Sequence, residues 1–189
     1  MPLPTRDEER TACARVIMPD GRPLHVYGTV LPWLSDRRRL PLTGTAAFLA
    51  ALAEQAADWC RLRDTHLDAA LCVVGDLNQD LRAAGHYYGS SAGRAALRAA
   101  LACAGLTCLT GGDGDPVARL GGGRASIDHV CVAGLSVAGR DDAISAWPAP
   151  EHIGRRLSDH HGVVVALETG HVSLTTPEPA PRPADLEVA

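Results

Sequence analysis

The pattern of hydrophobic and polar positions in the first third of the chain predicts a β-hairpin followed by a long helix. Residues 13–18 and 24–30 are rich in apolar and β-branched side chains, and Pro, Asp and Gly residues stand between them. From residue 46 to about residue 63, large apolar side chains recur at helical spacing. We therefore expect two strands joined by a tight turn, and then a helix.

The next apolar run, LCVVG at residues 71–75, predicts a buried strand that ends in polar residues. Gly75 allows the backbone to leave the strand, and Asp76 and Asn78 follow two positions apart. Alternation with a period of two would point these two side chains to the same side. They either aim a carboxylate and an amide at one point in space, or form an Asx turn that only caps the strand. This stretch alone leaves both interpretations open.

The second half of the chain predicts one more helix and several short strands. Ser90 or Ser91 can cap a helix that runs to about residue 104, where Gly105 can end it. Strands are expected at residues 106–109, 127–133, 135–138 (as a partner of 127–133) and 163–167, with mostly loop at 141–157. Helices and strands in this order indicate a mixed α and β protein.

Composition and charge limit the classes of function. Hydrophobic residues make up 46% of the 189 residues, as in a globular protein with a real core. All 18 basic residues are Arg, and the abundance of Ala, Arg and Gly suggests a bacterial source with a high-GC genome. The net charge of -4 provides no overall basic field for nucleic acid, so an anionic substrate would need a metal ion or local Arg residues.

Cysteine usage and the terminal segments favour a cytoplasmic protein. None of the six cysteines forms a CxxC pair, and most lie in apolar segments, which favours free buried thiols over disulfides or a zinc site. The polar N-terminus has no apolar core of signal-peptide length. No run approaches the roughly 18 apolar residues of a membrane span. We therefore expect a cytoplasmic protein with no membrane span.

Three short motifs place acids beside predicted strands. They are GDLN at residues 75–78, SIDH at 126–129 and SDHH at 158–161. Each motif alone is weak evidence, because Asp128 could be a satisfied core carboxylate, Asp159 and His160 could cap a turn, and His161 could be a bystander. Polar residues at strand ends are nevertheless a common location for the chemistry of enzymes that contain sheets.

Together and in this order, the three motifs resemble the endonuclease/exonuclease/phosphatase superfamily. These metal-dependent phosphoesterases include abasic-site endonucleases, DNase I-like nucleases, sphingomyelinases and inositol polyphosphate phosphatases. The resemblance covers roughly residues 16–167 and implies an α+β fold of the DNase I-like type, a four-layer α/β/β/α sandwich, with one domain at residues 13–168. Residues 1–12 are expected to form a flexible arm, and the Pro-rich residues 169–189 a disordered tail.

The resemblance implies a role for each acid-bearing position. Asp76 would orient or deprotonate the attacking water, and Asn78 would bind the scissile phosphate through its amide. Asp159 would help to hold Mg²⁺ or Mn²⁺, or the water bound to that ion. His160 would contact the phosphoryl oxygens or transfer a proton, and Asp128 would accept a hydrogen bond from its other nitrogen. The substrate would be a phosphodiester or phosphomonoester in a nucleic acid, a phospholipid head group, or a sugar or inositol phosphate.

The sequence departs from the family pattern in its first segment. Family members carry a strand with an Asn and a strand with a metal-binding Glu before the hairpin, which starts here near Cys13. The preceding residues offer only Asp7, Glu8 and Glu9, with no strand pattern around them. The fold is therefore expected to be N-terminally incomplete. The chain is then either part of a longer active enzyme, or a catalytically impaired fragment that acts as a phosphate-ligand or protein-binding module.

Other residues have two possible interpretations. Val30 stands where many family members have a His that contacts phosphate. The run of Arg residues at 37–39 could contact a phosphate backbone, but a solvated loop is favoured. Tyr87 and Tyr88 could stack on a base or sugar, or pack against the edge of the fold. Trp33 is interpreted as a loop anchor.

Overall fold

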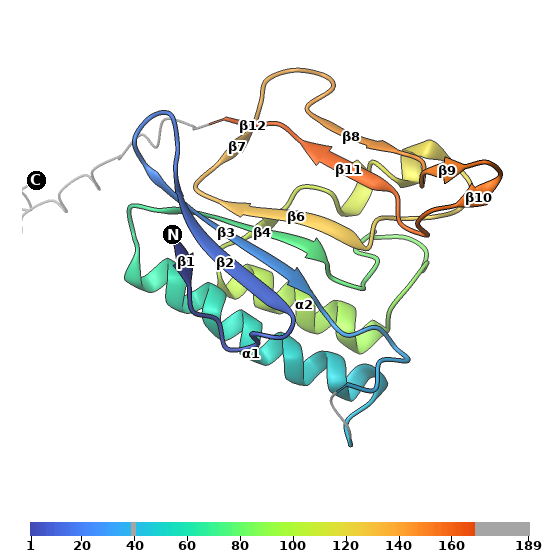
Figure 1. Cartoon of the computed structure of the whole chain (residues 1–189), viewed down its shortest axis with the longest axis horizontal. Helices are drawn as coiled ribbons and strands as arrows, with labels where there is room; N and C mark the ends of the chain where they lie inside the picture. Colours follow the sequence, from blue (N-terminus) through green and yellow to red (C-terminus); the bar gives the residue numbers. More distant parts are fainter. Residues whose placement is uncertain (39–40, 169–189) are drawn as a thin grey trace, which may run out of the picture.

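A six-stranded mixed sheet forms the centre of the computed structural model, which describes residues 1–38 and 41–168 (Figure 1). The strand order is β1-β2-β3-β4-β6-β5. Neighbouring strands are antiparallel except for β3 and β4, which run parallel. The strands are β1 (Pro2–Leu3), β2 (Thr11–Ile17), β3 (Pro23–Val30), β4 (Ala70–Asp76), β5 (Thr107–Cys108) and β6 (Asp128–Ala133).

The predicted hairpin is confirmed as β2 and β3. The two strands pair in continuous antiparallel register from Thr11 opposite Thr29 to Ile17 opposite Pro23. Gly21 has a φ of 84° in the turn, a conformation that side-chain-bearing residues rarely adopt. Alternate side chains of each strand therefore point to opposite faces of the sheet, and other elements of the fold lie over both faces.

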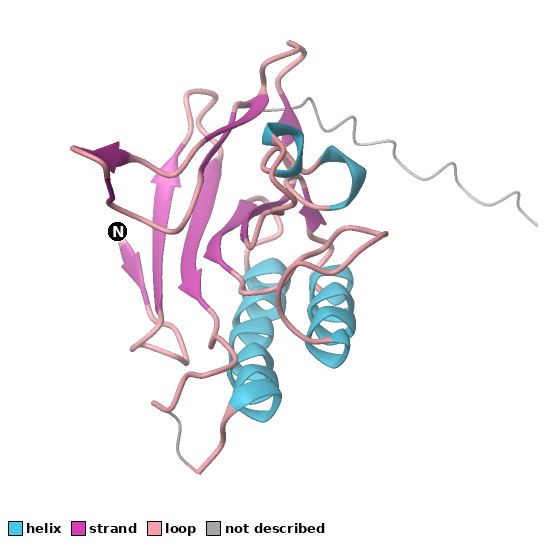
Figure 2. Cartoon of the chain, turned by 90° about the vertical axis from the view of Figure 1, so that its right-hand side faces the viewer, coloured by secondary structure: helices cyan, strands magenta, loops and turns pink. Residues whose placement is uncertain are grey.

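Two long helices lie side by side on one face of the sheet (Figures 1 and 2). Helix α1 (Gly44–Thr65) is four residues longer than predicted, and α2 (Ser91–Cys103) begins where expected. The hydroxyl of Ser90 accepts a hydrogen bond from the Gly93 backbone N–H at 3.0 Å, which caps α2. After α2, Gly105 has a φ of 64°, as expected for a residue that ends a helix.

The hydrophobic core fills the space between these helices and the sheet. Tyr27 of β3 meets Trp59 of α1 edge to face, with ring centroids 6.2 Å apart. Leu71 and Val73 of β4 and Leu97 of α2 are almost completely buried in the same cluster. Each large apolar side chain buried in this way stabilises the fold by about 1.5–3 kcal/mol. The core therefore fixes the strands β3 and β4 whose ends carry the candidate site.

The C-terminal strands pair with one another over the opposite face of the main sheet (Figure 1). Antiparallel pairs join β8 to β11, β9 to β10 and β7 to β12. These strands are β7 (Ser136–Val137), β8 (Ile144–Trp147), β9 (Glu151–His152), β10 (Arg155–Arg156), β11 (Gly162–Val165) and β12 (Leu167–Glu168). One prediction is wrong here, because the segment 135–138 pairs with β12 instead of with 127–133. The segment 141–157, predicted to be mostly loop, also contains the short strands β8, β9 and β10.

The layers differ in part from those that the family resemblance implied. Within the described residues, the two long helices cover one face of the main sheet and short strand pairs lie over the other face. The α+β class agrees with the prediction, whereas the four-layer sandwich is not what residues 1–38 and 41–168 build. In the same described part of the chain, no helix is long and apolar enough to cross a membrane.

The first twelve residues make fixed contacts, in contrast to the flexible arm that the sequence suggested. Strand β1 pairs with β2, and the buried carboxylate of Asp7 accepts a hydrogen bond from the Gln55 amide of α1 at 3.0 Å. Gln55 in turn accepts a bond from the Thr29 hydroxyl at 2.5 Å. Polar residues thus join the start of the chain to α1 and β3. The tail predicted at residues 169–189 lies outside the described residues.

Candidate functional site

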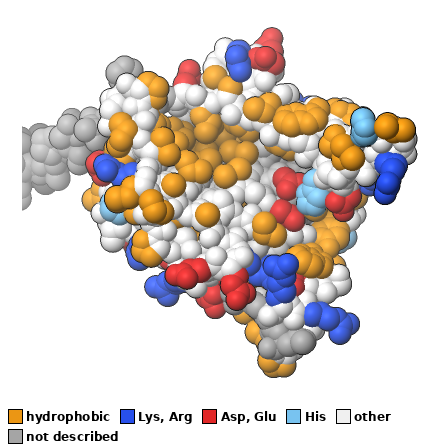
Figure 3. Space-filling view, viewed as in Figure 1, with side chains coloured by type: hydrophobic (Ala, Val, Ile, Leu, Met, Phe, Trp, Pro, Cys, Tyr) orange, Lys and Arg blue, Asp and Glu red, His pale blue; other side chains and the backbone are white. Residues whose placement is uncertain are grey.

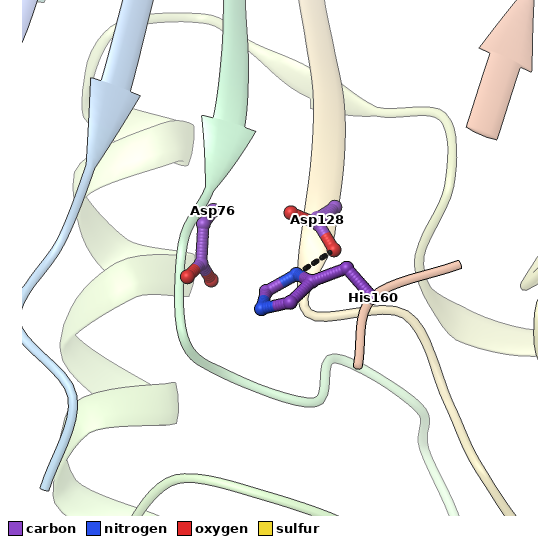
Figure 4. Close-up of side chains that lie close together, drawn as sticks. All are labelled: Asp76, Asp128 and His160. Carbon is purple, nitrogen blue, oxygen red and sulfur yellow. Dashed lines mark hydrogen bonds and ion pairs between the residues drawn. The ribbon is translucent and has the colours of Figure 1, made fainter. Parts of the chain in front are cut away.

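The three acid-bearing motifs meet at one edge of the main sheet (Figure 4). Asp76 ends β4 and Asp128 begins β6, and the two are direct partners in the antiparallel ladder. His160 comes from the loop before β11 and lies beside both carboxylates. One ligand atom from each of the three residues lies within 4.8 Å of the others. Segments that are far apart in the sequence therefore build one compact acidic cluster with a histidine.

Asp128 and His160 form the pair that the resemblance implied. The Nδ1 atom of His160 donates to the Asp128 carboxylate at 2.7 Å, so the proton on that nitrogen is fixed by its partner. Burial alone would lower the pKa of His160, but the hydrogen bond and charge of Asp128 raise it above the usual value. The negative charges of Asp76 and Asp159 act in the same direction. The imidazole therefore favours its protonated form and can present a positive Nε2–H.

Asp76 and Asn78 form the Asx turn, which is one of the two arrangements that the sequence left open. The Asp76 carboxylate accepts from the Asn78 backbone N–H at 3.0 Å, which is an Asx turn. The Asn78 amide also donates to Asp76 at 2.8 Å and to the Leu31 carbonyl at 2.8 Å. Asn78 adopts a φ of 50°, which brings its side chain back over the strand end. Because both amide hydrogens bind within the protein, Asn78 here holds Asp76 in position.

The surroundings of Asp76 disfavour its negative charge. Burial raises the pKa of Asp76 to about 6, and the neighbouring charge of Asp128 acts in the same direction. The hydrogen bonds from Asn78 and the charge of His160 offset only part of this effect. Two carboxylates held together in this way are stabilised by a cation between them. A carboxylate with a pKa close to neutrality is also a better proton acceptor than an ordinary Asp.

Gly75 brings β4 close to β3 immediately before the site. Its φ is 139°, and a Cβ at this position would lie 2.0 Å from the Thr29 carbonyl oxygen. Only glycine fits such a close backbone approach. The sequence signal for a strand ending at Gly75 thus has a direct structural reason, because this approach sets the position of Asp76.

Asp159 lies at the margin of the cluster. Its side chain is 85% exposed, and its Oδ1 lies 3.9 Å from the Nε2 of His160. Its backbone carbonyl accepts a hydrogen bond from Arg124 at 2.9 Å. The structure therefore places Asp159 next to His160 and outside the compact group of Asp76, Asp128 and His160. Its metal-binding role remains a prediction.

A surface cavity of about 430 Å³ opens beside the cluster and contains Asp76, Asn78, Asp159 and His160. Sequence reasoning missed Arg124, which also lines this cavity and brings a positive charge to it. The other lining residues are Val30, Trp33, Tyr87, Tyr88 and Ile127. The cavity therefore combines acids, a histidine, an arginine and aromatic walls.

Several other sequence expectations can now be located. Trp33, interpreted as a loop anchor, lines the cavity, as do both tyrosines. Arg37 and Arg38 are exposed, and Arg39 lies outside the described residues. Glu8 and Glu9 are exposed on the surface, and among the described residues the cluster that could hold a metal includes neither of them.

The residues of the cluster offer a chemically reasonable set of ligands for a divalent cation. Asp76 and Asp128 supply carboxylate oxygens, which Mg²⁺ prefers and Mn²⁺ also accepts, and His160 lies beside them with its Nδ1 bound to Asp128. Burial and, after it, the charge of Asp128 raise the pKa of Asp76, and a cation between the two carboxylates would offset both effects. The donor set therefore fits either ion.

The chain has an α+β fold in which two aspartates and a histidine lie together at one edge of a mixed sheet. No protein-family model and no curated protein matches the chain. Among solved structures, the fold is similar to the crystal structure of an endonuclease/exonuclease/phosphatase from Beutenbergia cavernae DSM 12333, with a TM-score of 0.52 and 21% identity over 90% of this chain. The chain spans 44% of that protein's chain. This similarity concerns the fold alone.

Proposed function

We propose that this chain carries part or all of the active site of a divalent-metal-dependent phosphoesterase. The reaction would be hydrolysis of a phosphodiester or phosphomonoester. The observation that carries the proposal is the hydrogen-bonded Asp128–His160 pair, which faces Asp76 beside a polar cavity. The fold similarity to an endonuclease/exonuclease/phosphatase supports it.

The roles of the side chains follow from their contacts. Asp76, oriented by Asn78, accepts a proton from the water that attacks phosphorus. His160 keeps its proton at Nδ1 toward Asp128 and directs Nε2–H at a phosphoryl oxygen or at the leaving oxygen. Arg124 adds positive charge on the cavity wall, which an anionic substrate needs because the chain has a net charge of -4. Proton acceptance and charge stabilisation thus come from different residues.

The cofactor in this proposal is Mg²⁺ or Mn²⁺. Asp76 and Asp128 would hold it, with Asp159 at the margin of the same cavity and His160 beside them to act on the substrate. When bound, the ion would neutralise phosphate charge and lower the pKa of a bound water. The aromatic residues Trp33, Tyr87 and Tyr88 on the cavity wall suit a substrate with a base or sugar ring beside its phosphate.

The Asp128–His160 pair provides the first test of the proposal. We expect Asp128→Ala to lower turnover by about 10²–10⁴-fold, as for loss of a general acid–base partner. The assay is hydrolysis of bis(p-nitrophenyl) phosphate and p-nitrophenyl phosphate with added Mn²⁺. His152→Ala in the exposed strand β9 is the matched control and should keep the wild-type rate. A loss of less than about threefold in Asp128→Ala would contradict the role given to this residue.

The His160→Ala variant separates catalysis from binding. Equal rates for the wild-type chain and His160→Ala, both at the level of buffer with Mn²⁺, would exclude catalysis by this chain. Calorimetric titration with Mn²⁺ then tests the metal site independently, because Asp76→Ala should weaken binding even where turnover is not measurable.

A second candidate function is non-catalytic binding of a phosphorylated ligand or of a protein partner. It is favoured by the composition of the cluster, which contains two aspartates and a histidine but no glutamate among the described residues. This alternative predicts that inorganic phosphate binds in the cavity and that binding weakens in Arg124→Ala, without turnover of either nitrophenyl substrate. Turnover that depends on His160 would reject it.

A further inference from the structure

The helix-covered face of the sheet carries a second group of reactive side chains. Cys108 of β5 and Cys131 of β6 are direct partners in the antiparallel ladder. The next ladder bond runs from the Leu109 N–H to the Val130 carbonyl at 2.8 Å, which makes the cysteines a non-hydrogen-bonded pair. In such pairs the Cα atoms are about 4.5 Å apart and the side chains lie close together. This spacing is within the range in which disulfides form.

His129 lies on the same face because it precedes Cys131 by two residues. Its Nε2 donates to the Gln79 carbonyl at 2.9 Å, so the proton is on that nitrogen. The other nitrogen, Nδ1, lies 3.2 Å from the Thr110 hydroxyl and 3.6 Å from the Cys108 sulfur. A histidine oriented by a third group and aimed at a thiol is the arrangement that activates cysteine nucleophiles.

Only one of the two thiols opens to the surface. Cys108 lines a cavity of about 330 Å³ together with Leu81, Arg98, Leu106 and Gly111. Cys131 lies behind it and is completely buried. A small reagent from solvent therefore meets Cys108 first.

We propose that Cys108 is a site of oxidative modification by hydroperoxides, with Cys131 as the resolving thiol. In the first step the sulfur of Cys108 attacks the outer oxygen of the hydroperoxide. An S–O bond forms, the O–O bond breaks, and the thiol proton leaves with the alcohol or water; Cys108 becomes a sulfenic acid. In the second step the sulfur of Cys131 attacks that of Cys108. An S–S bond forms, the S–O bond breaks, and the hydroxyl leaves as water with the proton of Cys131.

The electrostatics of the pair are consistent with this order of events. The hydrogen bond from the Cys131 thiol lowers the pKa of Cys108, and the contact with His129 adds to the effect against the opposing influence of burial. The same contact and burial raise the pKa of Cys131, which therefore stays protonated. Arg98 of α2 and Asp113 also line the cavity.

A second cysteine pair in the same chain provides a matched comparison. Cys60 of α1 and Cys103 of α2 have their sulfurs 3.8 Å apart, and Cys103 is exposed. Burial, Cys103 and the charge of Asp64 raise the pKa of Cys60. This pair thus has proximity and access to solvent, but the environment of Cys60 disfavours its thiolate.

The experiment treats the full chain with hydrogen peroxide at about pH 6, blocks the remaining thiols by alkylation and maps the peptides by mass spectrometry. We expect the Cys108–Cys131 disulfide to form at least about tenfold faster than the Cys60–Cys103 disulfide. Cys103→Ser should leave the rate at Cys108 unchanged. Cys131→Ser should leave a sulfenic acid at Cys108 that dimedone traps. Equal rates for the two pairs, or oxidation confined to Cys60 and Cys103, would overturn the proposal; both readouts are independent of phosphoesterase activity.

Discussion

The two faces of the main sheet differ in how well their apolar residues are covered. On the face toward the helices, Tyr27 and Val73 are completely buried. On the opposite face, Val16 remains 47% exposed and Val30 41% exposed. Figure 3 shows that hydrophobic side chains gather in the hollowed middle of this view, between the main sheet and the C-terminal strands. The apolar side chains on the first face are buried in a hydrophobic core, whereas some on the second face remain partly exposed to solvent.

The candidate phosphoesterase site lies on the less covered face. Asp76 and Asp128 share this face with Val30, because the three are aligned across β3, β4 and β6. A polar site at the edge of an incompletely covered sheet is accessible to substrate, but it receives less support from packing. The helix-covered face therefore provides most of the stability of the fold, and the less covered face carries the candidate phosphoesterase site.

The largest expected effect belongs to the helix-covered face. Trp59→Ala should lower the free energy of unfolding by about 3–5 kcal/mol, because it removes a completely buried ring that packs on Tyr27. Chemical denaturation monitored by circular dichroism measures the loss. A loss below about 1 kcal/mol would mean that this face does not hold the fold together.

An intermediate effect is expected at the site. The pKa of Asp76 is raised from an ordinary 3.8 to about 6. The folded state therefore binds this proton more tightly than the unfolded chain does. As pH rises through that interval, the loss of the proton destabilises the folded state. Relative to wild type, Asp76→Asn should therefore gain up to about 3 kcal/mol of unfolding free energy between pH 4 and pH 7. Thermal unfolding at several pH values, without added metal, measures the difference. If the difference in unfolding free energy between Asp76→Asn and wild type does not change with pH, the pKa of Asp76 is not raised in the folded state.

The smallest effect on folding is expected on the open face. Val16→Thr should change the free energy of unfolding by only about 0.5 kcal/mol, because the side chain is already half exposed. The same change should reduce self-association of the chain, measured by sedimentation velocity, since exposed apolar surface drives association. A wild-type chain that is monomeric and folds cooperatively would contradict the idea that this face requires a cover.

Local signals in the sequence account for the parts of the fold that were predicted correctly. Strand β4 followed from a Val-rich run that ends at a glycine, and α2 followed from a serine cap and the terminating Gly105. The partners of β7 were not predictable in this way, because its pairing with β12 joins segments about thirty residues apart and depends on the whole chain.

The residues of the candidate site that belong to the three motifs were predicted from the sequence, whereas those that only the fold brings to the site were not. Asp76, Asp128 and His160 came from three motifs, and the structure brings them together. Arg124 stands after three glycines, in a loop without periodicity, so no pattern separated it from the other arginines. The φ of 50° at Asn78, which turns its amide onto Asp76, also has no signature in a single sequence.

Neighbouring residues of β6 serve opposite sides of the sheet, and this limits how the sequence can evolve. Asp128 belongs to the acidic cluster, whereas His129 points to Cys108 beneath the helices. Inserting or deleting one residue within this strand would move the residues beyond the change to the opposite face, so that Asp128 and His129 could not both keep their positions relative to the rest of the strand. Substitutions in β6 can be tested one at a time by selection, but a change of its length alters both clusters at once. Natural variation in chain length should therefore collect in the glycine-rich loop before Ser126 and spare the strand itself.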